Sequence, residues 1–544
     1  MSENLYPATG PPVHSKSNTC VLHTGVSPSI PSPFATTLKN IQVNKDIWNS
    51  GVCVYHINKP QHCLPPAYDK SDRVLRFDSQ FESGNLYSAF QMSHDSYHAI
   101  LEFDKNASGS CQWFYFKIMN VKSSIKYTFY LSGFHKVSGV FHSGYRVFWY
   151  SEALSKHKNI SWARGGYNYS YGVTKKDHTG KRSTLQFSIQ FPYDDDSVYI
   201  AYSLPYTYTY LMKQISLWSH HFNRVFQSEI FCQSYGGKDC PIITITNPRS
   251  LIPYEKKEYI FITARIHPGE TNGSIVLHGM IDFLLSKCMY STFLLDNYII
   301  KIIPMVCIDG VIEGHYRISL SGYDLNRIWS EPDPLLHPVV FRIKEMMKQV
   351  TQYSRIAFYL DFHGHSRLHS TFAYGCPPEP NSELVGTEKL FPKVISSISD
   401  DFSWARCVFS FPEGRKASSR IVIRKELGVS YSYTIESSFG GVTSGPHIGT
   451  LYNEARWKNI GQKTGEAMAI VLSGKHKEII SRFSTKPTMA KKFPKSSLVL
   501  LSASKEENKQ KSIIIARKTI VSSGSSTRMF IRKTESYSKF NHDL

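Results

Sequence analysis

One stretch near the middle of the chain, EYIFITARIHPGETNG (258–273), constrains the fold more than any other. It begins with an apolar, β-branched run, which predicts a buried strand, and Pro268 and Gly269 then force a turn at the end of that run. A helical pattern follows at once. The turn carries His267 and Glu270, an imidazole and a carboxylate that together suit zinc. Because one such pair also arises by chance in a solvated turn, the metal interpretation depends on a third ligand downstream.

Length and charge set the broad class of the protein. The chain has 544 residues, 41% of them hydrophobic, which predicts two or three globular domains. Its formal net charge is +20, and residues 476–544 contribute half of it, with 15 Lys or Arg against 5 Asp or Glu. Such a balance favours an acidic partner, which can be nucleic acid, an anionic membrane surface or an acidic protein.

The sequence shows neither a signal-peptide pattern nor a long apolar run. An apolar stretch of about 18 residues would be needed to span a membrane, and none is visible. The ten cysteines are scattered without CxxC pairs, as is typical of reduced thiols. We therefore expect an intracellular, soluble protein.

Pattern changes divide the chain into four segments. Residues 1–69 are rich in Ser, Pro and Thr and are expected to be largely disordered or extended. Residues 70–206 show short alternating strands between turn signals, which predicts an antiparallel β-sandwich. Residues 207–475 alternate strand and helix patterns, which predicts an α/β domain. Residues 476–544 are expected to form a basic, disordered tail.

The α/β segment predicts a doubly wound, mixed sheet with helices on both faces. Strand patterns recur at 259–263, 298–306, 355–362 and 428–439, and helices are expected after His267, from Pro338 onward and near 448–473. In sheets of this kind, binding sites form at the carboxyl ends of the strands. The turn that carries His267 lies at one such end.

A second histidine follows another predicted strand. RIAFYLDF ends just before His363, which is therefore the preferred third zinc ligand. His365, two residues deeper in the loop, is the alternative, and a purely structural histidine at a strand end is a third interpretation. Asp361 is a candidate to hold the imidazole in the correct tautomer.

Four further polar residues complete the candidate site. Asn326 and Arg327 form an amide–guanidinium pair suited to binding a carboxylate, and Arg317 adds a second cation. Glu436 lies on an apolar strand, where burial would raise its pKa and suit it to general base catalysis. Surface salt bridges for the arginines, and a structural ion pair for Glu436, are the alternatives.

Taken together, the motifs resemble a known family. HPGE, DLNRIW, DFHGH and YTIESSF occur in the order and at the separations seen in the cytosolic carboxypeptidases, a branch of the zinc metallocarboxypeptidases. The resemblance covers about 70–475. In the sandwich it includes RFDSQFESGNL (76–86), QWFYFKIMN (112–120) and PYTYTYL (205–211), and in the α/β domain SSRIVIRKELGVSYSYTIESSF (418–439).

The resemblance implies a β-sandwich followed by an exopeptidase domain that binds one zinc ion. By position, the zinc ligands are His267, Glu270 and His363. Glu436 matches the general base, and Arg317 the residue that polarises the scissile carbonyl. Asn326 and Arg327 match the residues that hold the terminal carboxylate of the substrate. Two departures affect this region: Cys307-Ile308-Asp309-Gly310 replaces Asn-Pro-Asp-Gly, and His315 replaces an Asn.

Selection of glutamate requires another cation. The candidates lie in EGRKASSRIVIRK (413–425), and Arg420 is preferred because it matches the arginine of the family's Thr-Ala-Arg motif. We expect Arg424 and Lys425 on the solvated face of a strand; Arg415 and Lys416 stay open as alternatives.

The resemblance also implies a substrate. Family members remove glutamates from the C-termini or side chains of tubulin and other acidic-tailed proteins. We therefore expect protein deglutamylation in the cytoplasm, with microtubules, cilia or the nucleus as further locations, and neither membrane nor nucleic acid as partner. A zinc amidohydrolase of small N-acyl amino acids and a non-catalytic, basic microtubule-binding protein are the rival functions. The sequence does not specify an oligomeric state.

Overall fold

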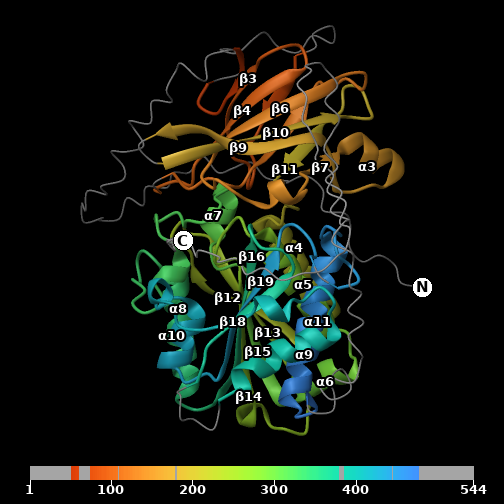
Figure 1. Cartoon of the computed structure of the whole chain (residues 1–544). Coiled ribbons are helices and arrows are strands. Elements are labelled where there is room, and N and C mark those ends of the chain that lie inside the picture. Colours follow the sequence, from red (N-terminus) through yellow and green to blue (C-terminus); the bar gives the residue numbers. More distant parts are fainter. Residues whose placement is uncertain are drawn as a thin grey trace, which may run out of the picture. The chain divides into compact units, whose positions relative to one another are not determined.

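The computed structural model describes residues 51–59, 74–107, 109–177, 180–378, 385–443 and 445–476. The predicted basic tail and most of the predicted amino-terminal segment lie outside these residues. The two sheet-containing parts belong to one compact unit (Figure 1). No helix among the described residues is long and apolar enough to cross a membrane.

The amino-terminal part is a sandwich of two sheets. The six-stranded sheet has the order β1-β3-β4-β6-β10-β9, with bounds Val52–His56, Leu86–Gln91, Ser96–Leu101, Lys126–Phe134, Gly180–Gln190 and Tyr167–Asp177. The five-stranded sheet has the order β2-β5-β11-β7-β8, with bounds Arg76–Asp78, Tyr115–Met119, Val198–Ala201, Phe148–Ser151 and Ala163–Arg164. A short helix, α3 (Glu152–Lys158), follows β7. The predicted sandwich is therefore confirmed in type.

Two details of the sandwich differ from the sequence prediction. Strands β4 and β6 pair in parallel, whereas the other pairs of the two sheets are antiparallel. Strand β1 pairs with β3, and its Val54 and Tyr55 are buried in the core. The predicted start of the sandwich at residue 70 is therefore too late. Strand β1 precedes it, and the Pro-containing sequence between them gave no sign that the strand belongs to the sheet.

The second part is built on an eight-stranded mixed sheet of order β12-β13-β15-β14-β16-β19-β17-β18. The strand bounds in that order are Phe226–Gln233, Asp239–Ile245, Tyr298–Ile303, Glu258–Ala264, Ile356–His365, Tyr431–Ser438, Thr371–Gly375 and Val408–Phe409. The central pairs β15-β14, β14-β16 and β16-β19 are parallel. Their residues are almost continuously buried, as expected for strands covered on both faces.

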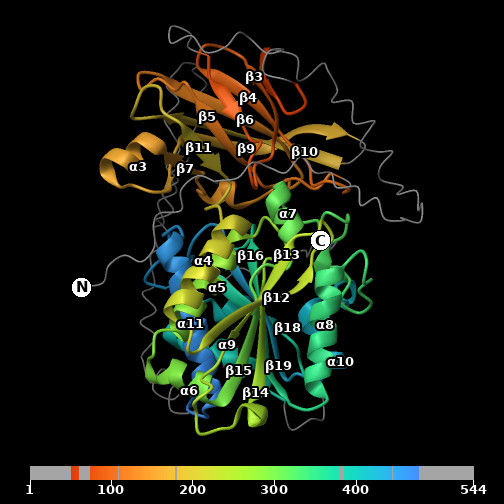
Figure 2. The ribbon, with the colours of Figure 1, turned by 180° about the vertical axis from the view of Figure 1, so that it is seen from behind.

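Helices cover both faces of this sheet, as predicted. Their bounds are α4 Tyr208–His221, α5 Thr271–Leu284, α6 Met289–Asn297, α7 Ile308–Glu313, α8 Pro338–Thr351, α9 Leu390–Ile398, α10 Ser419–Glu426 and α11 Glu454–Leu472. Both ribbon views show α8 and α10 on one face and α5 and α11 on the other (Figures 1 and 2). Close approach of α5 and α11 depends on Gly279 and Gly461, where an added Cβ would lie within 2.0 Å of a backbone oxygen of the other helix.

The parallel centre brings three strand ends together. Ala264, the last residue of β14, pairs with Phe362 of β16, and the next residue of β16, His363, pairs with Glu436 of β19. Residues paired across neighbouring parallel strands point to the same face of the sheet. The structure therefore places the predicted histidine and glutamate next to each other, beside the turn that follows β14.

Candidate active site

The turn between β14 and α5 is held by Arg265, a buried residue with a positive φ of 56°. Its guanidinium donates two hydrogen bonds to the carbonyl oxygen of Pro268, at 3.0 and 2.7 Å. Gly269 allows the backbone of Tyr316 to approach closely, because a Cβ at this position would lie 2.8 Å from the Cα of Tyr316. The turn is thus clamped from both sides, which fixes the direction of the His267 and Glu270 side chains.

His267, Glu270 and His363 converge as one buried group. Their potential ligand atoms all lie within 4.8 Å of one another. The Nδ1 atoms of His267 and His363 lie 3.0 and 2.9 Å from the two carboxylate oxygens of Glu270. Although burial opposes ionisation, the two histidines hold the pKa of Glu270 well below its usual range. The carboxylate is therefore in the ionised form that a metal ligand requires.

Two aspartates orient the imidazoles from behind. The Nε2 atom of His363 lies 2.7 Å from Asp361 Oδ2, and that of His267 lies 3.1 Å from Asp324 Oδ1. An Nε2–H that donates to a carboxylate leaves the Nδ1 lone pair free to bind a metal. The donor set of two Nδ1 atoms and one carboxylate, backed in this way, fits the three protein ligands of a catalytic zinc site.

The alternative ligand, His365, has a different environment. Its Nδ1 accepts hydrogen bonds from the backbone N–H groups of Leu368, at 2.9 Å, and Arg367, at 3.3 Å. Its ring packs against Phe372, with centroids 5.3 Å apart. The structure thus brings His363, and not His365, into the group with His267 and Glu270.

Glu436 lies beside this group, on the neighbouring strand. Its side chain is half-buried, and its register partner is His363. Burial raises the pKa of Glu436, with a further contribution from the negative charge of Glu270, while His363 acts in the opposite direction. A carboxylate with a raised pKa is suited to accept and return a proton near neutral pH.

Asn326 and Arg327 occupy a short 3-10 turn (Leu325–Arg327) capped by Asp324. Asn326 Nδ2 lies 3.5 Å from His363 Nε2, and its Oδ1 accepts a hydrogen bond from the N–H of Ser419 at 2.9 Å. Arg327 is half-buried and donates to the carbonyl of Asn326 at 2.9 Å. The following residues are tied down by Lys344, whose Nζ donates to the carbonyls of Trp329 and Ser330 at 2.8 and 2.6 Å.

Arg317 is positioned from two directions. Asp104, in the loop after β4 of the sandwich, accepts hydrogen bonds at 2.7 to 2.9 Å from the backbone N–H groups of Tyr316, Arg317 and Ile318. The Arg317 guanidinium contacts Asp324 Oδ2 through Nε at 2.9 Å and Nη2 at 2.7 Å. The sandwich therefore sets the backbone of Arg317, and Asp324 sets its side chain.

The departure at His315 is accommodated by hydrogen bonds of its own. His315 Nε2 accepts from the N–H of Lys105 at 3.0 Å, and Nδ1 donates to the carbonyl of Ile318 at 2.7 Å. The imidazole thereby bridges the sandwich loop and the Arg317 loop. This second contact between the two loops supports the backbone from which Arg317 projects.

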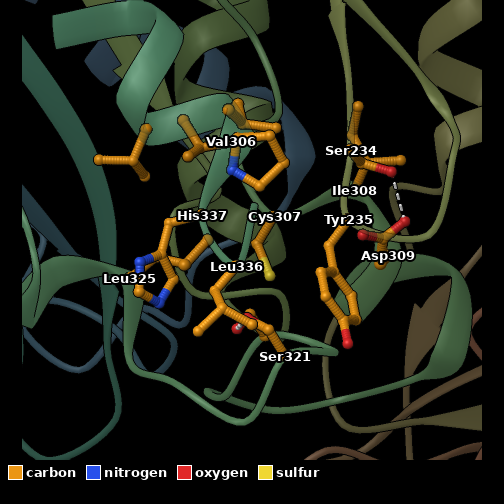
Figure 3. A pocket seen from close by; sticks show the side chains of 14 residues that line it. Ser234, Tyr235, Val306, Cys307, Ile308, Asp309, Ser321, Leu325, Leu336 and His337 are labelled. Atoms are coloured by element: carbon orange, nitrogen blue, oxygen red, sulfur yellow. Dashed lines mark hydrogen bonds between the residues drawn. The ribbon is translucent and has the colours of Figure 1, made fainter. Parts of the chain in front are cut away.

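The departure that begins Cys307-Ile308-Asp309 borders a small cavity (Figure 3). Asp309 accepts hydrogen bonds from Ser234 Oγ at 2.6 Å and the N–H of Gly236 at 2.9 Å. Cys307 is buried and lines the same cavity, whose volume of about 20 Å³ leaves room for a single water molecule. The Cys307-Ile308 sequence thus belongs to packing around this turn.

Arg420 lies on α10, so the expectation that the neighbouring Arg424 and Lys425 lie on a strand is wrong. The run SSRIVIRK fits both periods, and packing of α10 on β16 and β19 decides for the helix. Arg420 is buried, its Nε has no hydrogen-bond partner among the described residues, and its guanidinium lies 5.3 Å from the centre of the Tyr374 ring. Arg415 lies over the same ring at 5.8 Å.

Three cations near the trio are not held in salt bridges by any described residue. Within the described ranges, Arg327, Arg415 and Arg420 form no ion pair with a carboxylate. Burial lowers the pKa of Arg420, and the charge of Arg415 adds to this effect. A cluster of unpaired guanidinium groups is a receptor for an acidic ligand.

Sequence reasoning missed three residues that shape this site. Asp324 was detectable in principle, since it lies two residues before Asn326 in DLNR. Asp104 and Lys136 come from the sandwich and carry no local signal, because their importance lies in contacts with residues more than 170 positions away.

Family models identify both parts of the chain. A model described as zinc carboxypeptidase matches residues 215–454, and one described as the cytosolic carboxypeptidase N-terminal domain matches residues 77–202. The chain belongs to the cytosolic carboxypeptidases. Zinc is the metal of this carboxypeptidase family, and the trio of His267, Glu270 and His363 fits it. The predicted family, fold and cofactor are thus confirmed.

Individual relatives are similar over most of this carboxypeptidase chain. Cytosolic carboxypeptidase 1 of Xenopus laevis is 35% identical over 445 residues, which are 75% of this chain and 36% of that protein. Cytosolic carboxypeptidase 2 of Danio rerio is 34% identical over 407 residues, which are 73% of this chain and 55% of that protein. The chain therefore spans only about a third of the length of the first curated relatives it matches.

Solved structures support the carboxypeptidase fold. A metallo-carboxypeptidase from Burkholderia cenocepacia superimposes with a TM-score of 0.60 at 20% identity, over 74% of this chain and 99% of that one. A metallo-carboxypeptidase from Pseudomonas aeruginosa, in complex with (2-guanidinoethylmercapto)succinic acid, gives 0.58 at 22% identity, over 73% and 99%. At these identities the likeness shows the fold alone.

Proposed function

We propose that this chain is a zinc-dependent carboxypeptidase that removes glutamates from the C-termini, or from side-chain-linked chains, of acidic protein tails in the cytoplasm. Polyglutamylated tubulin is the foremost candidate substrate. One observation carries the proposal. The guanidinium groups of Arg327, Arg415 and Arg420, which form no ion pair with a carboxylate among the described residues, lie around a buried donor set that fits zinc. Such a site suits a substrate with one carboxylate at its terminus and another on its side chain.

The proposed roles follow from this arrangement. Bound zinc supplies Lewis acidity, which activates water and polarises a carbonyl. Glu436 accepts a proton from the attacking water and later returns it to the nitrogen of the leaving residue. Arg317 donates hydrogen bonds to the carbonyl oxygen as negative charge develops on it.

Substrate selection falls to the remaining polar groups. Asn326 and Arg327 pair with the terminal carboxylate, which an internal peptide does not offer, so only the last residue is released. Arg420 pairs with the side-chain carboxylate of glutamate. Its buried and unpartnered Nε supports this role, because an unpaired buried donor is costly unless a ligand completes it.

The test uses purified protein with polyglutamylated tubulin and with short peptides that end in glutamate, read out by mass spectrometry. We expect successive losses of single glutamates from wild-type incubations. Glu436→Gln should remove this activity while keeping zinc, because an amide cannot accept the proton. Glu345→Gln, a matched change at a surface salt bridge on α8, should leave turnover unchanged.

Three results would contradict the proposal. The first is glutamate release by Glu436→Gln within a few-fold of wild type. The second is hydrolysis of N-acyl amino acids together with no release of glutamate from any peptide, which would favour the amidohydrolase interpretation. A purified chain without stoichiometric zinc would favour a binding protein instead.

A further inference from the structure

Lys136 reaches the candidate active site from the sandwich. It follows strand β6 and is half-buried. Its Nζ donates hydrogen bonds to Tyr316 Oη, at 2.5 Å, and to Ser366 Oγ, and lies 4.5 Å from the centre of the Tyr316 ring. Tyr316 precedes Arg317, and Ser366 follows the strand that carries His363. An ammonium group of the first domain thus lies against two loops of the second.

The ammonium of Lys136 is incompletely satisfied. A lysine has three N–H donors, and two of those of Lys136 are used by neutral hydroxyl groups. The buried Lys257 fills all three with Thr246 Oγ1 and two backbone carbonyls. Lys344 fills its three with two carbonyls and the carboxylate of Glu426. In the part of the chain that the structure describes, Lys136 has no ion pair with a carboxylate.

Charged groups of the site act on Lys136. Burial first, and Arg317 second, lower the pKa of Lys136 to about 7, whereas Glu270 and Glu436 act in the opposite direction. An incoming carboxylate would favour the charged form of this amine. The site therefore offers Lys136 two negative neighbours at a distance but no direct counter-ion.

The cations of the site contact two different aromatic rings. Arg415 and Arg420 share the ring of Tyr374, and Lys136 lies over the ring of Tyr316, next in sequence to Arg317. In the proposed reaction, Arg420 binds the side-chain carboxylate of the leaving residue, and Arg317 contacts the scissile carbonyl. Lys136 contacts Tyr316, the neighbour of Arg317 in the sequence, and Ser366, in the loop after the strand of His363. It therefore lies next to the residue proposed to contact the scissile carbonyl, and it is not among the two cations at Tyr374.

We propose that Lys136 binds the side-chain carboxylate of the residue that precedes the scissile bond, so that the enzyme selects an acidic penultimate residue as well as a terminal glutamate. This inference rests on the proposed function. It makes the sandwich a direct part of substrate recognition, and it favours runs of glutamate over single C-terminal glutamates.

The test compares two peptides that end in Glu-Glu and Gln-Glu and are otherwise identical. Wild-type protein should prefer the Glu-Glu peptide in kcat/KM. Lys136→Gln should lose about ten- to thirtyfold on this peptide, the range of one charge-assisted hydrogen bond at a partly exposed position, and less than about threefold on Gln-Glu. Lys136→Arg should retain most of the preference. Lys126→Gln, the same change at the exposed opposite end of β6, should match wild type.

A merely structural role for Lys136 predicts a different result. If Lys136 only ties the two domains together, Lys136→Gln will lower kcat/KM equally on both peptides, and that outcome overturns the inference. Indifference of the wild-type protein to the penultimate residue also overturns it.

Binding separates this inference from the proposed function. Fluorescence anisotropy of the two labelled peptides, measured in the Glu436→Gln background with and without Lys136→Gln, reports the preference without turnover. If wild type releases no C-terminal glutamate, the proposed function fails, and the binding preference still decides the role of Lys136. If it releases glutamate without any penultimate preference, only the inference fails.

Discussion

Asp324→Asn is the most informative single substitution, because this carboxylate holds both a proposed zinc ligand and Arg317. Oδ1 accepts from His267 Nε2 at 3.1 Å and from the N–H of Asn326 at 2.9 Å, while Oδ2 accepts from Arg317 Nε and Nη2. Burial opposes its ionisation, but His267 and Arg317 hold the pKa of Asp324 well below its usual range. The side chain is therefore charged at neutral pH.

An asparagine cannot satisfy both sides at once. With its oxygen toward His267, its NH₂ group faces the guanidinium of Arg317, donor against donor; flipped, it faces the Nε2–H of His267 and the N–H of Asn326. Loss of a carboxylate behind a metal-binding histidine typically costs about 10- to 100-fold in metal affinity or activity. Loss of charge-assisted bonds to Arg317 costs about 1.5–3 kcal/mol, or roughly 10- to 150-fold in kcat/KM.

Zinc competition against a fluorescent chelator measures the first effect, and peptide kinetics at saturating zinc measure the second. Relative to wild type, we expect Asp324→Asn to lose at least about tenfold either in zinc affinity or in kcat/KM at saturating zinc. Where zinc is limiting, kcat/KM should fall about 100-fold. Asp333→Asn is the matched control, since that exposed aspartate caps backbone N–H groups outside the site. Zinc affinity and kcat/KM both within threefold of wild type would refute the role assigned to Asp324.

Three further predictions test the site and the sandwich. His363→Ala should lose bound zinc, measured by elemental analysis, whereas His365→Ala should retain it; the reverse would make His365 the ligand. Arg420→Ala should lower release of C-terminal glutamate about 10- to 150-fold while sparing a C-terminal leucine, if one is cleaved; equal losses on both peptides would remove Arg420 from side-chain recognition. Burial lowers the pKa of His98 from 6.5 to about 4, so the unfolded chain binds a proton at pH 5 that the folded chain does not. The contribution of this group to the free energy of unfolding should be fully present above the unfolded pKa. It should fall by about 3 kcal/mol as the pH drops toward 4. Denaturant unfolding of His98→Gln should show a correspondingly flatter pH dependence; an unchanged slope would contradict this.

Local pattern was sufficient for the strand, turn and helix around His267. A β-branched run makes a buried strand, Pro268 and Gly269 end it, and helical spacing resumes directly afterwards, so each step depends on neighbours in the sequence. The same reasoning placed Glu436 on a strand and His363 just past the end of another, although β16 continues to His365. Parallel pairing then brings strand ends to one edge. Proximity of these groups therefore followed from periodicity and topology.

The tertiary structure decided everything that depends on distant contacts. Whether SSRIVIRK (418–425) forms a strand or a helix was undetermined locally, and packing on β16 and β19 settled it. Strand β1 was assigned to the sandwich by its pairing with β3, which no local pattern predicts. The support of Arg317 by Asp104 and the approach of Lys136 to Tyr316 join residues of different domains. Hydrogen bonds and charge pairs of this kind act through space, and the sequence carries no periodic signal for them.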